Sequence, residues 1–69
     1  MSKALITPMQ QVILDLVAEL QDQATPHRIA EVLSERNGKR YMPRDVDRTL
    51  TSMELKGLIV SRGITRMVA

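Results

Sequence analysis

Three prolines constrain the fold of this chain more than any other feature of its sequence. Proline suits the first turn of a helix, where its fixed φ is already helical and its missing N–H would be unpaired, and it breaks a helix further along. The three occur as Thr7-Pro8, Thr25-Pro26 and Met42-Pro43. We therefore predict an N-terminal arm over residues 1–7, followed by helices over residues 8–22, 26–36 and 43–56.

The residues beside these prolines support the predicted helix ends. Thr7 and Gln10 have the spacing of a capping box, and Thr25 is a favourable N-cap for the second helix. Asn37-Gly38 predicts the end of the second helix, because both residue types adopt the left-handed conformation that satisfies the last carbonyl groups.

Apolar residues recur with the helical period in all three segments, at about 100° per residue. Residues expected in the core are Met9, Val12, Ile13, Leu16, Val17 and Leu20, then Ile29, Ala30 and Leu33 with Val32 flanking them, then Val46, Leu50 and Met53. Leu14 and Ala18 fall outside the first stripe. One hypothesis is a homodimer contact formed by helix 8–22 and the arm, through Leu5, Ile6, Leu14 and Ala18. The alternative is that these are ordinary exposed apolar residues.

The residues after the third helix are typical of a short β-hairpin. Lys56-Gly57 ends the helix, and residues 58–68 form two apolar stretches about the turn signal Arg62-Gly63. We expect Leu58, Val60 and Ile64, with Met67 or Val68, to pack beneath the helices. The predicted fold class is therefore α+β, a single domain of three helices with a C-terminal two-stranded hairpin.

Positive charge is concentrated in the second half of the chain. Residues 1–35 contain two Lys or Arg and five Asp or Glu, a net charge of −3, whereas residues 36–69 contain eight and three, a net charge of +5. Segregated positive charge is typical of surfaces that bind nucleic-acid phosphates. The alternative is a solvated surface of mixed charge, which describes most charged stretches.

The third predicted helix carries the candidate binding residues. The face opposite its apolar stripe holds Arg44, Arg48, Thr51 and Leu55, with Ser52 beside them. Arginine donates bidentately to guanine edges or phosphates, and Thr and Ser add hydrogen bonds. We predict that Arg44, Arg48, Thr51 and Ser52 read bases. Phosphate contacts are predicted for the basic residues around this helix, namely Lys39, Arg40, Lys56, Arg62 and Arg66.

Residues 46–62 carry a resemblance to a known superfamily. Val46-Asp47-Arg48-Thr49-Leu50, then residues 53–59 and Arg62, are similar to the recognition helix and first wing strand of MarR-like, PadR-like and Fur-like repressors. The chain therefore resembles winged helix-turn-helix proteins, although residues 37–42 form a longer connection than MarR-like proteins have. The resemblance implies a small transcriptional regulator of prokaryotic, phage or plasmid type. Its third helix would enter the major groove of double-stranded DNA, and its hairpin would be the wing.

A second hypothesis is a winged-helix protein-interaction module, an adaptor or inhibitor of a host complex that does not bind DNA. An enzyme is not expected, because the chain has no Cys, no glycine-rich phosphate loop and one histidine, His27. We expect no cofactor and no metal: Asp45 and Asp47 lie on opposite flanks of a helix. With no membrane-spanning run and no signal peptide predicted, a cytoplasmic location is expected.

Overall fold

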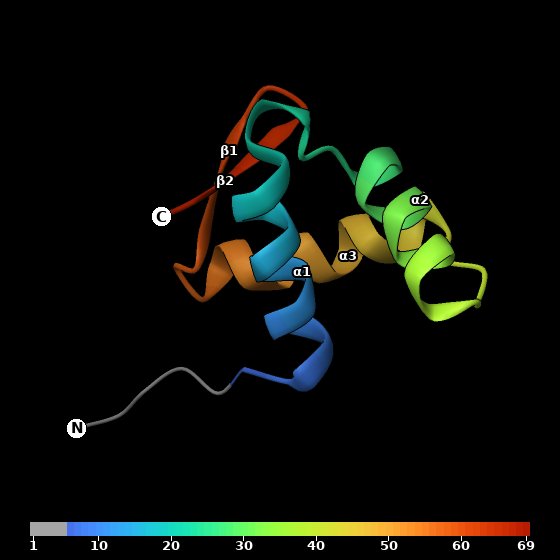
Figure 1. Cartoon of the computed structure of the whole chain (residues 1–69). Coiled ribbons are helices and arrows are strands. Elements are labelled where there is room, and N and C mark those ends of the chain that lie inside the picture. The colour runs from blue at the N-terminus through green and yellow to red at the C-terminus, as the bar shows by residue number, and fades with distance from the viewer. Residues whose placement is uncertain (1–5) are drawn as a thin grey trace.

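The computed structural model describes residues 6–69, which form three α-helices and a C-terminal antiparallel hairpin (Figure 1). This arrangement confirms the α+β class. The elements, in order, are α1 (Pro8–Leu20), the 3₁₀ turn η1 (Gln21–Gln23), α2 (Pro26–Asn37), α3 (Pro43–Leu55), β1 (Ile59–Arg62) and β2 (Thr65–Val68). The first helix is shorter than predicted, because Gln21 has a φ of 53° and the chain turns there into η1. None of the described helices is long and apolar enough to cross a membrane.

The predicted helix caps are confirmed. The Thr7 hydroxyl accepts the N–H of Gln10, and the Gln10 side chain accepts the N–H of Thr7, which completes the capping box. The Thr25 hydroxyl accepts the N–H of Arg28 at the start of α2. Gly38 ends α2 with a φ of 64°, so the left-handed turn predicted at this position is present.

The core lies where α3 passes α1, with α2 against one part of α3 and the hairpin against another (Figure 1). Burial of α2 and α3 follows the prediction, but the buried face of α1 is rotated. Met9 and Val12 are 36% and 41% exposed, while Gln10 is buried and Leu14 packs against the core. The prediction for Met9 and Val12 is therefore wrong, because the neighbouring elements cover only one side of α1.

The hairpin register also differs from the prediction, by one residue. Ile59 is 1% exposed, whereas Val60 is 45% exposed and Ile64 lies exposed in the turn. The cause is the end of α3, where Gly57 has a φ of 77° and the N–H of Leu58 donates to the carbonyl of Met53. This Schellman turn uses Leu58 to close the helix, so the strand begins with Ile59 inward. A shift of one residue exchanges the two faces of a strand.

The outer edge of β2 is attached to the connection between η1 and α2. The main-chain N–H of Arg66 donates to the carbonyl oxygen of Ala24 over 2.9 Å, and the Thr65 hydroxyl donates to the main-chain carbonyl of Asp22 over 3.3 Å. Ala24 is fully buried at this junction. The hairpin is therefore held on one edge by these two hydrogen bonds and beneath by the side chain of Ile59.

Neighbouring β1 residues provide a direct test of this register. Ile59→Ala should lower the free energy of unfolding by about 3 kcal/mol, because it removes a fully buried side chain and leaves a cavity. Val60→Ala should lower it by less than about 1 kcal/mol, because that side chain is half exposed. Urea denaturation followed by circular dichroism measures both. Equal losses, or a larger loss at Val60, would contradict the observed register.

Candidate functional site

The outward face of α3 presents the four residues predicted to read bases. Arg44, Arg48, Thr51 and Ser52 are all exposed, on the side away from the buried residues of the helix. The side chains of Arg44, Arg48 and Ser52 form no bond with any other residue within 6–69. The Thr51 hydroxyl donates to the main-chain carbonyl of Asp47 over 3.0 Å, so its methyl group and oxygen lone pairs remain for other contacts. Two unpaired guanidinium groups therefore lie one helical turn apart.

Arg66 does not project from the hairpin as the sequence suggested. Its side chain is only 13% exposed, and its guanidinium group reaches α3, where Nη2 lies 3.0 Å from Oδ1 of Asp47 and Nε lies 3.9 Å from Oε1 of Glu54. Its Nη1 donates to the carbonyl oxygen of Ile64, and Nε is buried without a hydrogen bond. Ser61 also donates to Glu54. Arg66 thus offsets two carboxylates of α3, a contact that sequence periodicity alone did not reveal.

The other four predicted phosphate-binding residues are exposed at three places around α3. Lys39 and Arg40 lie in the connection before the helix, which is anchored where the N–H of Tyr41 donates to Oγ of Ser34 over 3.0 Å. Arg62 ends β1, and its side chain forms no bond within the described residues. Lys56, just after α3, donates to the side-chain oxygen of Gln10 over 2.9 Å and so ties the end of α3 to the cap of α1.

The two arginines of α2 are paired. Arg28 forms an ion pair with Glu31 on α2, and Arg36 donates to Glu19 of α1 over 2.7 Å. The hydrogen bond to Glu19 and the negative charge of that carboxylate raise the pKa of Arg36 above its ordinary value. The unpaired arginines of residues 6–69 are therefore Arg40, Arg44, Arg48 and Arg62, all of them in the basic half of the chain.

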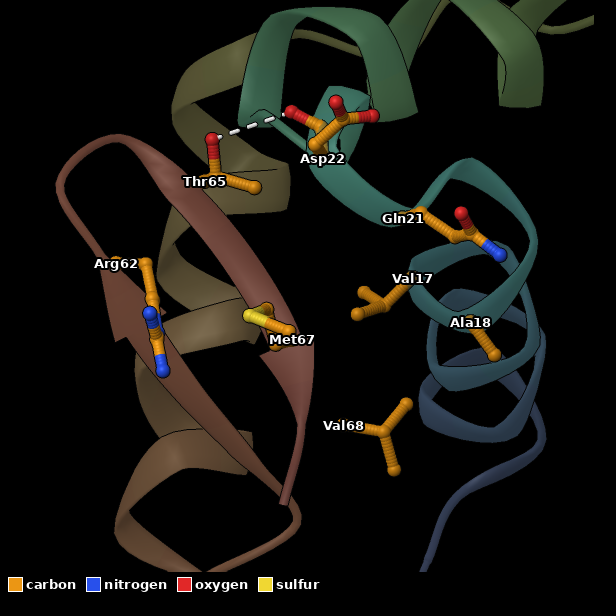
Figure 2. A pocket seen from close by; sticks show the side chains of 8 residues that line it. All are labelled: Val17, Ala18, Gln21, Asp22, Arg62, Thr65, Met67 and Val68. Atoms are coloured by element: carbon orange, nitrogen blue, oxygen red, sulfur yellow. Dashed lines mark hydrogen bonds between the residues drawn. The ribbon is translucent and has the colours of Figure 1, made fainter.

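The residues predicted to form a dimer contact differ in exposure. Leu5 lies outside the described residues, Ile6 and Ala18 are exposed, and Leu14 packs partly buried against the core. Ala18 instead lines a groove of about 670 Å³ between the end of α1 and the hairpin (Figure 2). Within residues 6–69, no three His, Cys, Asp or Glu side chains lie together in a group that could hold a metal ion.

Comparison with known proteins adds no relative: no family model, no curated protein and no solved structure matches this chain. Its function therefore has to be inferred from its own residues.

The contact between Arg66 and Asp47 can be measured with a double-mutant cycle. Arg66→Met and Asp47→Ala, made singly and together, should give a coupling energy of about 1 kcal/mol, because the pair is partly buried and close. Chemical denaturation of the four proteins gives this value. The matched control is the cycle between Arg66 and Asp45, a neighbouring carboxylate that forms no bond with Arg66. Equal coupling in the two cycles would contradict the contact.

Proposed function

We propose that this protein is a sequence-specific double-stranded DNA-binding protein of the winged helix-turn-helix type, and that it acts as a small transcriptional regulator of prokaryotic, phage or plasmid type. The observation that carries the proposal is the outward face of α3, where Arg44 and Arg48 are exposed and unpaired within residues 6–69. The order of three helices and a following hairpin agrees with the resemblance carried by residues 46–62.

Helix α3 has the dimensions and chemistry for base reading. Thirteen residues span about 20 Å at 1.5 Å per residue, and the major groove of B-DNA admits one α-helix. Arg44 and Arg48 can each donate two hydrogen bonds to the O6 and N7 atoms of a guanine. Ser52 follows one turn later with a free hydroxyl, and the Thr51 methyl suits contact with a thymine methyl group.

The acidic residues of α3 would oppose this function unless their charge were offset. Asp47 and Glu54 both belong to α3, and phosphates are repelled by carboxylates. The guanidinium group of Arg66 lies against both, which reduces their negative potential toward DNA. We therefore assign Arg66 a positioning role between the hairpin and α3, in place of the phosphate contact predicted from sequence. Among the predicted phosphate contacts, we retain three residues on either side of the helix, namely Lys39, Arg40 and Arg62.

A protein-interaction module is the second candidate, and one observation favours it. Leu55 is 86% exposed and lies on the same face as Arg48 and Thr51. A large exposed leucine among polar residues can insert into an apolar pocket of a protein partner. On DNA, the same side chain would contact thymine methyl groups and sugars. Whether the face binds duplex DNA at all distinguishes the two candidates.

The test is the affinity for random duplex DNA across a salt series. With the three phosphate contacts assigned above, the logarithm of the association constant should fall with the logarithm of salt concentration with a slope of about −3. Arg44→Ala combined with Arg48→Ala should weaken binding by at least about tenfold at fixed salt. Fluorescence anisotropy of labelled DNA measures both quantities.

A single-charge comparison separates a local effect from a change of net charge. Arg48→Ala and Arg36→Ala each remove one positive charge, but Arg36 is paired with Glu19 away from the outward face of α3. Only Arg48→Ala should weaken binding severalfold. Absence of binding even at low salt would refute the DNA-binding proposal and favour the protein-interaction module. Equal effects of the two variants would show that binding follows net charge, and would contradict the role of the outward face of α3.

A further inference from the structure

A groove with an apolar centre runs between the end of α1 and the hairpin, and no described element covers it (Figure 2). Buried Val17 of α1 points toward Met67 of β2 across it in Figure 2, and Ala18 also lines it. Met67 is paired directly with Val60, so both side chains lie on the same face of the hairpin. These two residues are 42% and 45% exposed, and Val68 beside them is 47% exposed. The hairpin therefore presents two half-exposed apolar side chains on this face, and Val68, from the alternate face of β2, also lines the groove.

The two sides of this groove carry opposite charges. Asp22 comes from η1 on one side and Arg62 from β1 on the other, and both are exposed. Neither side chain forms a bond with another residue in the part of the chain that the structure describes. Thr65 reaches the main-chain carbonyl of Asp22, which leaves the carboxylate unused. The groove thus has an apolar centre with one unpaired negative and one unpaired positive group at its sides.

We propose that this groove binds a second copy of the same chain, in a two-fold symmetric dimer in which Asp22 of each copy pairs with Arg62 of the other. A two-fold contact brings one surface patch against itself, so the patch has to be self-complementary. An apolar centre pairs with itself, and opposite charges on its two sides pair reciprocally across the axis. A surface that binds a partner of a single charge would need charged groups of only the opposite sign.

Two further properties fit a second copy. The charged residues that line this groove are one Asp and one Arg, so in a symmetric dimer two chains that face each other attract in two places. A 69-residue domain has a small core, and burial of further apolar surface by association stabilises it.

The dimer would leave the outward face of α3 uncovered. Ser61 and Arg66 of the hairpin bond to Glu54 and Asp47 of α3, on the other face of the hairpin from Val60 and Met67. In Figure 2 the ribbon of α3 passes behind the hairpin, away from the groove. Of the residues assigned to DNA contacts above, only Arg62 also takes part in the dimer contact, and self-association can be measured without DNA.

Sedimentation of the full chain over about 1 µM to 1 mM, without DNA, tests the proposal. The unmodified protein should dimerise in this range. Asp22→Arg and Arg62→Glu should each raise the dimer dissociation constant by at least about tenfold, because each places two like-charge contacts in a symmetric dimer. An equimolar mixture of the two variants should form a heterodimer close to the unmodified affinity, since both contacts are then between opposite charges.

The control pair reverses charges outside the groove. The control variants are Glu35→Arg on α2 and Arg40→Glu in the connection that follows it. Neither should change the dimer dissociation constant by more than about twofold. Circular dichroism establishes that each variant is folded. A further variant, Met67→Ser, makes the centre of the groove less apolar without a change of charge, and it should also weaken the dimer. A protein that stays monomeric at the highest concentration would overturn the proposal. The proposal would also be overturned if the Asp22→Arg and Arg62→Glu variants each dimerised like the unmodified protein. It would equally be overturned if an equimolar mixture of the two variants stayed monomeric.

Discussion

Arg66 is the residue on which the arrangement of this small domain depends most. Its main-chain N–H bonds to Ala24, which attaches β2 to the connection before α2, and its guanidinium group reaches Asp47 and Glu54 of α3. One residue therefore sets the position of the hairpin relative to the connection and to α3. A shift of the hairpin would expose Ile59 and leave a largely buried guanidinium group without its carboxylates, which is costly in a medium of low polarity.

The same contact shapes the electrostatics of the candidate site. A helix with Arg44 and Arg48 but also three carboxylates would bind phosphates poorly, because charges on neighbouring turns act at distances shorter than the screening length. With two of those carboxylates beside Arg66, the unpaired charges of the outward face are mostly positive. The contribution of Arg66 to binding would then be indirect, through the potential of α3.

The hairpin separates two surfaces with different chemistry. Toward α3 it presents polar side chains that bond to the helix, and away from α3 it presents Val60 and Met67 beside the end of α1. Because strand side chains alternate, a four-residue strand can serve both sides at once. Binding on one surface does not require the other to be covered.

The sequence by itself determined where the three helices begin and where α2 ends: the three prolines, the caps at Thr7 and Thr25, and the stop at Gly38 act through bonds within a few residues. It also determined which face of α3 is outward, since Val46, Leu50 and Met53 repeat regularly. Tertiary structure decided which side of α1 is covered, which β1 residue points inward, and where Arg66 reaches. These three features depend on contacts between segments far apart in the chain. The buried side of α1 depends on where α3 and the hairpin pack, and Arg66 contacts Asp47, which lies 19 residues away in the sequence. Periodicity within one element contains no information about such distances.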